Sequence, residues 1–231
     1  MLFMTIPTAG ARQELLSALI QDCGLPLDHI VIVATKPNVE LPDGVVVLED
    51  FDTANIQRWW ASGIEEAQRR GATAVAVLND DIRVGHGSLA SLHEALMSTG
   101  AAIASPSRPP FKNGVHRRPL APYEPRLWGS LWVVRVDSGL RPDPRYVWWY
   151  GDNDLDIRAR RDHGGVVLCD VEYEHLHPSE GTSSNSALVA QTDIDAQTFE
   201  AQYARLLRLS RLIRRWQTRF RQRGGKHHAG V

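Results

Sequence analysis

The sequence predicts an α/β protein with a central, mostly parallel mixed sheet flanked by helices. Over the first hundred residues, short apolar runs alternate with segments of helical periodicity, as in chains that build a helix-covered parallel sheet. The run Ala-Val-Ala-Val-Leu at 74–78 contains no polar residue, which is typical of a central parallel strand. A length of 231 residues, 43% of them hydrophobic and 23% charged, suits one sizeable domain, or one domain with an appendage.

The first half of the chain alternates between the two kinds of element. Strands are expected at 2–6, 30–33, 45–48, 74–78 and 101–104. Helices are expected at 15–20, where leucine and isoleucine recur at helical spacing, at about 53–70, and at 87–97. Gly24 with Pro26 ends the first of these helices, and Gly71 ends the second.

A proline-rich stretch then interrupts the pattern. Six prolines lie between Pro106 and Pro125, and because proline donates no backbone N–H, this stretch is expected to be a long loop. The basic residues of the loop are Arg108, Lys112, His116, Arg117 and Arg118. Two interpretations stay open, a lid over an anionic ligand and a plain surface loop.

The second half is expected to contain fewer and shorter strands. They are 130–136, 166–169 and 171–175, with a helix at 152–163 that Gly164 and Gly165 end. A loop rich in serine, threonine and glycine follows at 179–186, and a long amphipathic helix runs from about 195 to 223. We expect two units, a domain at 1–190 that contains the candidate sites and a C-terminal basic amphipathic helix and tail at 191–231.

The charge distribution separates an acidic body from a basic tail. Residues 1–204 carry 17 Lys and Arg against 27 Asp and Glu, a net charge of −10, whereas residues 205–231 carry nine cations and no acid. The acidic body disfavours a nucleic-acid partner. For the C-terminal helix three roles stay open: docking on its own body or in a homo-oligomer, lying on an anionic membrane surface, and, less favoured, nucleic-acid contact.

Targeting signals and cysteines bear on where the protein acts. The N-terminus lacks the charged leader of a signal peptide, and no apolar run approaches the roughly 20 residues of a membrane span. Cys23 and Cys169 form at most one disulfide and are expected to be reduced thiols. We therefore expect a cytoplasmic protein, with peripheral contact at the inner membrane face as the alternative.

The first candidate site follows the buried strand at 74–78. Asn79, Asp80 and Asp81 come directly after it, and ligands of open α/β sheets bind beyond the carboxyl ends of the strands. Two carboxylates there suit Mg²⁺ or Mn²⁺, which takes further ligands from water and substrate phosphates. The alternative is a polar turn in which Asn79 or Asp80 caps the next helix.

The second candidate site is the start of the helix at 152–163. Asp152, Asp154 and Asp156 crowd its first turn, where the helix dipole favours negative charge. Asp152, as an N-cap carboxylate next to Trp148 and Trp149, is a candidate general base for a hydroxyl held against these rings. An ordinary acidic first turn is the alternative, and Asp156 with Arg160 is most simply a surface pair.

The third candidate site is a pair of histidines. His175 and His177 alternate on a strand and so lie on one face, next to a Gly-Thr-Ser loop. Either histidine could be a ligand of a metal or of phosphate, although a lone histidine is usually structural. Zinc is disfavoured because no companion cysteines accompany the pair.

The order and separation of these motifs resemble those of the family-2 glycosyltransferases. The residues that carry the resemblance are Ile6-Pro-Thr8, Leu78-Asn-Asp-Asp81, Tyr150-Gly-Asp-Asn-Asp-Leu155, Arg158-Ala-Arg160, and His177 with Gly181-Thr-Ser183. The resemblance covers roughly residues 1–185. It implies the A-type fold of the nucleotide-diphospho-sugar transferases and a metal-dependent, inverting transfer of a sugar to an acceptor hydroxyl.

The resemblance also implies roles for single residues. Asp152 would be the catalytic base. The metal, Mg²⁺ or Mn²⁺, would be held by Asp81, His177 and Asp80, with His175 as the alternative ligand. The nucleoside-diphosphate sugar would be bound by Pro7, Thr8, Arg12, Asn79 and Asp80. The acceptor, a glycan, a lipid-linked molecule or a protein, would be bound by Trp148, Trp149 and Asp154.

Departures from the family pattern leave parts of this assignment open. Asn79 stands where the family often has an acid, Thr35 and Lys36 follow the second strand where the family has a base-reading Asp, and Gly151 replaces a Glu. Two other functions stay open. They are a non-catalytic protein that binds a glycan or a partner on the same fold, and a metal-dependent nucleotidyltransferase.

Overall fold

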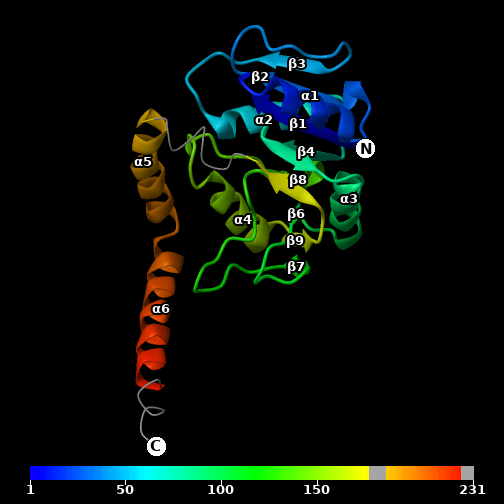
Figure 1. Ribbon diagram of the computed structural model, residues 1–231. Coiled ribbons are helices and arrows are strands. Elements are labelled where there is room, and N and C mark those ends of the chain that lie inside the picture. The colour runs from blue at the N-terminus through cyan, green and yellow to red at the C-terminus, as the bar shows by residue number, and fades with distance from the viewer. Residues whose placement is uncertain (177–185, 225–231) are drawn as a thin grey trace, which may run out of the picture.

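The computed structural model describes residues 1–176 and 186–224 of the chain, and within them an α/β fold. Eight strands form one mixed sheet in the order β3-β2-β1-β4-β8-β6-β9-β7 (Figure 1). The four strands β3, β2, β1 and β4 run parallel to one another, β8 is antiparallel to both of its neighbours β4 and β6, and β9 is parallel to β6. The predicted fold class, a mostly parallel mixed sheet flanked by helices, is therefore confirmed.

The helices and strands follow the predicted order closely. The strands are β1 Leu2–Thr8, β2 Ile30–Ala34, β3 Val46–Glu49, β4 Ala74–Leu78, β5 Ile82–Val84, β6 Ile103–Pro106, β7 Gly114–His116, β8 Leu131–Arg135, β9 Val166–Cys169 and β10 Tyr173–His175. The helices are α1 Gln13–Asp22, α2 Ile56–Arg69, α3 Ser88–Thr99, α4 Gly151–Asp162, α5 Ser186–Gln202 and α6 Ala204–Gly224. Short 3-10 turns lie at Leu27–His29 and Val136–Ser138.

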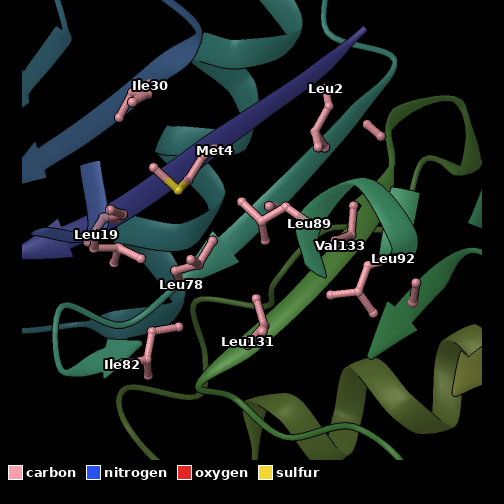
Figure 2. Packing of buried hydrophobic residues seen from close by; sticks show 14 of the residues in the cluster. Leu2, Met4, Leu19, Ile30, Leu78, Ile82, Leu89, Leu92, Leu131 and Val133 are labelled. Atoms are coloured by element: carbon pink, nitrogen blue, oxygen red, sulfur yellow. The ribbon is translucent and has the colours of Figure 1, made fainter. Parts of the chain in front are cut away.

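The apolar periodicity of the helices explains the two layers of the core. Buried leucines and isoleucines of α1 and α3 form one cluster with the sheet residues Met4, Leu78 and Leu131 (Figure 2). Buried residues of α2 and α4 cover the other face of the sheet, where Trp60 meets Trp132 edge to face at 5.8 Å. Both faces of β1 and β4 are thus buried, which is why these strands carry no alternation of polar and apolar residues.

The sheet topology decides where a site can form. β4 pairs in parallel with β1 on one side and antiparallel with β8 on the other, with Leu78 opposite Leu131. The carboxyl ends of β1 and β4 and the residues that precede β8 therefore meet at one edge of the sheet. The segment after Leu78 lies at this edge.

The secondary structure departs from the expected pattern in three places. The proline-rich stretch contains the edge strand β7, which pairs antiparallel with β9. The residues after Asp81 form β5, which pairs with β10 as a separate two-stranded ribbon. The C-terminal segment is two helices, α5 and α6, because the helix is interrupted at Tyr203, and the expected domain boundary at residue 190 falls inside α5.

The α5–α6 segment docks on the body of the protein. Phe199 and Tyr203 are buried in a small aromatic cluster with Tyr123, Tyr146 and Ile157 of the body. The ring of Phe199 also stacks on Tyr150 with the centroids 5.2 Å apart. The structure thus favours docking on the body for α5 and the start of α6. Among the helices of the described residues, no helix has the length and apolar character needed to cross a membrane.

Candidate functional site

Asp80 lies at the carboxyl ends of β4 and β1, where the sequence predicts nucleotide-sugar contacts. The Thr8 hydroxyl donates a 2.6 Å hydrogen bond to Asp80, and the guanidinium of Arg12 lies 3.4 Å from the same carboxylate. Burial raises the pKa of Asp80, and the bonds from Thr8 and Arg12 act against this rise. Three of the predicted residues, from two separate parts of the chain, therefore meet at one point.

Asp81 faces the third predicted element. The Oδ1 atom of Asp81 lies 3.2 Å from Nε2 of His175, because β10 pairs with β5 and sets His175 opposite Ile82. The backbone N–H of Leu176 also donates to the carbonyl of Asp81 at 2.9 Å. The structure brings together Asp81 and His175. The other candidate ligand, His177, lies outside the described residues.

The alternative interpretation of this turn, as a cap for the next helix, is wrong. The helix that follows, α3, begins after Gly87, and its cap makes no side-chain hydrogen bond. Asn79 instead donates its backbone N–H to the carbonyl of Ser130 at 3.1 Å. Pro7 is buried in β1 opposite Val33, at the same end of the sheet.

The chemistry of Asp81 and His175 fits a divalent cation in part. Oδ1 of Asp81 is buried and accepts no hydrogen bond from the described residues, so its lone pairs are available. Adjacent ligands of octahedral Mg²⁺ are about 3 Å apart, close to the separation of these two atoms. Within the described residues no three His, Cys, Asp or Glu side chains gather into one metal-binding group, so further ligands would come from elsewhere.

Asp152 is the second residue of α4, not its N-cap as the sequence suggests, because Tyr150 takes the cap position. Its side chain is partly exposed, and the N–H of Asn153 donates to it at 2.9 Å. Burial raises the pKa of Asp152 to about 6, although bonds from the N–H groups of Asn153 and Gly129 lower it. At neutral pH such a carboxylate is ionised and still basic enough to accept a proton.

Asp152 is linked to the Asp80–Asp81 turn through the residues before β8. A Cβ atom on Gly129 would lie 3.7 Å from Oδ2 of Asp152 and 3.1 Å from the Trp60 ring, so Asp152 packs closely against the Gly129 backbone. The next residue, Ser130, accepts the hydrogen bond from Asn79 described above. One short segment therefore touches both acidic elements.

Gln57 is a residue of this region that the sequence analysis missed. It lies on α2 with 1% of its surface exposed, and a Cβ atom on Gly151 would come within 2.1 Å of its side chain. A larger side chain at position 151, such as the Glu that the sequence resemblance implies, would collide with Gln57. The sequence signal for Gln57 is Gly151 itself. A glycine where the resemblance implies a Glu indicates that another side chain fills this space. Oε1 of Gln57 is buried and has no hydrogen-bond partner among the described residues.

The predicted acceptor residues Trp148 and Trp149 lie in the loop before α4. Trp148 meets Trp59 edge to face at 6.1 Å, and Nε1 of Trp149 donates to the carbonyl of Leu188 at 2.8 Å. Both rings are partly exposed, so they keep surface that a ligand could contact.

The loop that carries these rings is fixed by Asp195 of α5, which the sequence analysis also missed. Its buried carboxylate accepts hydrogen bonds from the backbone N–H groups of Val147, Trp148 and Trp149 at 3.2, 2.9 and 2.7 Å. A carboxylate that accepts hydrogen bonds from three consecutive backbone N–H groups holds the loop in one conformation. The C-terminal helices therefore belong to the site's architecture.

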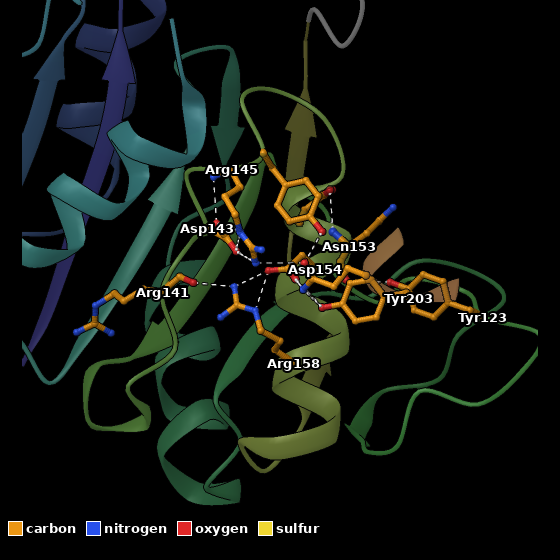
Figure 3. Close-up of polar contacts among 11 residues, drawn as sticks. Tyr123, Arg141, Asp143, Arg145, Asn153, Asp154, Arg158 and Tyr203 are labelled. Atoms are coloured by element: carbon orange, nitrogen blue, oxygen red, sulfur yellow. Dashed lines mark hydrogen bonds and ion pairs between the residues drawn. The ribbon is translucent and has the colours of Figure 1, made fainter. Parts of the chain in front are cut away.

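Asp154, predicted to bind the acceptor, is instead buried in the interior. Its side chain is 0% exposed, and it accepts hydrogen bonds from the Tyr203 hydroxyl at 2.5 Å and from Gln202 at 2.9 Å (Figure 3). Its second oxygen pairs with Arg158 at 2.6 Å. Since both oxygens are satisfied within the protein, Asp154 connects α4 to the α5–α6 junction and does not reach an acceptor.

Asp156 and Arg160 are a buried pair rather than the expected surface pair. Their carboxylate and guanidinium are 3.1 Å apart, with side chains 0% and 6% exposed. The Tyr123 hydroxyl and the N–H of Arg126 each donate to Asp156 at 3.1 Å. Burial raises the pKa of Asp156, whereas Arg160 lowers it. The pair therefore anchors the end of the proline-rich stretch to α4.

The proline-rich stretch reaches the site through Arg108. Its guanidinium lies 4.2 Å from the ring centroid of Trp128 and 5.4 Å from that of Tyr173, two residues before His175. Arg126 lies over the Phe111 ring at 3.6 Å. The Arg108 contacts pack the start of the stretch on Trp128 and Tyr173, the Arg126 contact joins the residue after the stretch to Phe111, and a lid role stays a prediction.

Comparison with known proteins supports the fold assignment. No protein-family model and no curated protein matches the sequence. Among solved structures, the chain is similar to TarS 1–349 of S. aureus, with a TM-score of 0.58 at 9% identity, over 88% of this chain and 72% of that one. The same TarS segment in complex with UDP gives a TM-score of 0.54 at 10% identity, over 88% and 72%. The complex of this segment with UDP-GlcNAc gives a TM-score of 0.52 at 9% identity, over 88% of this chain and 73% of that one.

At this level of identity the comparison shows the fold. It is the A-type nucleotide-diphospho-sugar transferase fold that the sequence resemblance implies, and that expectation is confirmed. The roles of individual residues rest on the geometry described above.

Proposed function

We propose that this protein transfers a sugar from a nucleoside-diphosphate sugar to an acceptor hydroxyl and inverts the anomeric configuration. The observation that carries the proposal is the meeting of Thr8, Asp80, Asp81 and His175 at the carboxyl end of β4, next to the segment against which Asp152 packs. In open α/β sheets this edge is where ligands bind.

Asp152 is the proposed general base. In a single displacement the acceptor hydroxyl attacks the anomeric carbon from the side opposite the departing nucleoside diphosphate, and its proton passes to Asp152. A pKa of about 6 leaves this carboxylate ionised at neutral pH and close enough to the working pH to accept a proton efficiently. The partly exposed rings of Trp148 and Trp149 are the proposed surface for the acceptor.

The diphosphate would be held on the other side of the site. Arg12 supplies a fixed positive charge near Asp80 and Asp81. Asp81 and His175 are the proposed ligands of a divalent cation, Mg²⁺ or Mn²⁺, with His177 as a further candidate. Such a cation, when bound, neutralises the charge that develops on the leaving diphosphate. Asp80, bonded to Thr8 and Arg12, is better suited to orient this arrangement or to contact the donor than to bind the cation directly.

The fold comparison suggests where to look for the donor. The TarS structures contain UDP and UDP-GlcNAc, so uridine-diphosphate sugars are the first donors to test here. Thr35 and Lys36 stand where the resemblance implies an Asp that binds the nucleobase. Because that residue is missing, the nucleotide has to be identified with a panel. Thermal-shift measurements with UDP-, GDP-, CDP- and dTDP-sugars in the presence of Mn²⁺ should show one that raises the melting temperature, because a ligand of the native state stabilises it by mass action.

The decisive experiment follows the product with the donor thus found. We expect release of a nucleoside diphosphate and sugar transfer, both abolished in Asp152→Asn, while the thermal shift with the donor persists. Release of pyrophosphate from a nucleoside triphosphate would instead indicate nucleotidyl transfer. A donor that binds without any turnover in the presence of acceptor candidates would favour a binding protein. Equal loss of donor binding in Asp152→Asn would contradict the role of Asp152 as a base.

A further inference from the structure

Helix α6 presents a stripe of large apolar side chains to solvent. Leu209, Leu212 and Trp216 are 52%, 55% and 60% exposed. They are three and four residues apart, so they lie along one side of the helix. Side chains of this size on a single helical stripe are typical of a surface that contacts another apolar phase.

A different face of α6 already docks on the body, so the exposed stripe is not needed for that contact. Leu206 and Leu207 pack against the aromatic cluster of Tyr123, Tyr146, Ile157, Phe199 and Tyr203. The Ser210 hydroxyl accepts a hydrogen bond from the N–H of Tyr123 at 2.8 Å, and Arg214 donates to the Tyr123 carbonyl at 2.9 Å.

Arginines border the apolar stripe. Arg208, Arg211 and Arg215 repeat the same spacing along a neighbouring stripe, and Arg205 continues the line of Leu209 and Leu212 toward the helix start. Arg211 lies 4.0 Å from Glu200, a contact between two exposed side chains. Residues 205–231 contain nine Lys and Arg and no acidic residue, so every formal charge in this part of the sequence is positive.

The exposed fractions of Leu209, Leu212 and Trp216 show that this side of α6 is accessible. In Figure 1, α5 and α6 run along one side of the molecule, and the C-terminal half of α6 continues beyond the end of the sheet and its covering helices. The stripe lies along the same stretch of α6 in which Ser210 and Arg214 bond to Tyr123, but on another side of the helix.

We propose that α6 lies on an anionic membrane surface, with Leu209, Leu212 and Trp216 inserted among the lipid chains and the arginines at the phosphate groups. A basic helix with leucine and tryptophan on one side and too little apolar character to span the bilayer binds in the plane of the interface. Its arginines add electrostatic attraction to anionic headgroups. This inference is independent of the reaction that the protein catalyses.

Two other occupants fit the stripe less well. A second copy of the chain would have to bury about 800 Å² on each side to form a stable dimer, and three side chains on one helix supply much less. A single-stranded nucleic acid would require aromatic side chains on which bases stack, whereas two of the three exposed apolar residues are leucine.

The test is flotation of the full-length protein with lipid vesicles. We expect binding to phosphatidylcholine vesicles that contain phosphatidylglycerol, weaker binding to pure phosphatidylcholine, and a decrease with added salt. Leu209→Ser/Leu212→Ser/Trp216→Ser should lower the partition coefficient at least about tenfold, because it removes the inserted side chains. Arg208→Gln/Arg215→Gln should lower it about tenfold or more on the anionic vesicles only.

Two matched controls carry the same changes on the body. Met97→Ser/Leu120→Ser alters exposed apolar side chains, and Arg69→Gln/Arg161→Gln removes two exposed cations, so neither should change the partition coefficient. Wild-type protein that does not float with anionic vesicles, or binds both compositions equally, would overturn the proposal. So would light scattering that shows a dimer which the triple substitution dissociates.

Discussion

The carboxylate of Asp195 accepts a 2.7 Å hydrogen bond from the backbone N–H of Trp149, and so ties α5 to the loop that leads into α4. The same carboxylate accepts hydrogen bonds from the N–H groups of Val147 and Trp148, five and four residues before Asp152. The C-terminal helices thereby help to set the position of the proposed base and of the proposed acceptor rings.

Asp195→Ala should destabilise the protein and impair the site together. Three buried or half-buried backbone donors lose their acceptor, which should cost about 3–5 kcal/mol in the free energy of unfolding. Urea unfolding measures this cost. The exposed neighbour Asp193 provides the control, since Asp193→Ala should change the free energy by no more than about 0.5 kcal/mol. Similar values for the two variants would show that the Asp195 contacts contribute little.

The pH dependence of the reaction should report on Asp152. With a pKa of about 6, the base is mostly ionised at pH 7, and kcat should fall about tenfold for each pH unit below 6. A pH profile of kcat with saturating donor and acceptor checks this. A rate that stays constant from pH 7 to 5 would contradict the assignment.

Asp152→Asn should separate stability from activity. The folded-state pKa of Asp152 is raised above its ordinary value, so the ionised group weakens the native state, and this cost appears as the pH rises through the window from about 4 to 6. The variant should therefore be more stable than wild type at pH 7, by roughly 1–3 kcal/mol, and equally stable near pH 4. Urea unfolding at both pH values measures the difference, and a variant that is less stable at pH 7 would show that the carboxylate is stabilising.

Removal of divalent metal should stop sugar transfer. EDTA is expected to abolish activity, and Mn²⁺ or Mg²⁺ in excess to restore it. Asp81→Asn should weaken Mn²⁺ binding at least about tenfold, measured by calorimetry in the presence of the nucleoside diphosphate. Asp43→Asn, at an exposed position, is the matched control and should bind Mn²⁺ as wild type does. Full activity in EDTA would leave Arg12 as the cationic group of the site and would exclude the metal role.

The close contact between Gly151 and Gln57 should make the stability effects of substitutions at the two positions non-additive. Gly151→Ala places a Cβ atom 2.1 Å from the Gln57 side chain and should cost roughly 1–3 kcal/mol in stability. Gln57→Ala removes the obstacle, so the double variant should be more stable than the sum of the two single variants predicts. Thermal or urea unfolding of the four proteins completes the cycle. Strict additivity would mean that the two residues are not coupled.

The proximity of the candidate residues at the carboxyl ends of β1 and β4 follows from strand order. Asp80 and Asp81 come directly after an apolar strand, and Thr8 ends another, so the parallel sheet necessarily brings them to one edge. His175 joins them because β10 pairs with β5, a pairing of three residues that carries no distinct pattern in the sequence. Which of His175 and His177 binds a ligand stays a prediction.

By itself, the sequence determined the sheet-and-helix order and the acidic turn after β4, because periodicity and strand ends are local properties of the chain. Only the tertiary structure decided which carboxylates are structural. Asp154 and Asp156 look like Asp152 in the sequence, yet Tyr203 and Arg158 enclose the first, and Tyr123 and Arg160 the second. Burial and charge pairing depend on residues that are distant in the chain. An aspartate therefore has a structural role at positions 154 and 156 and is a candidate base at position 152.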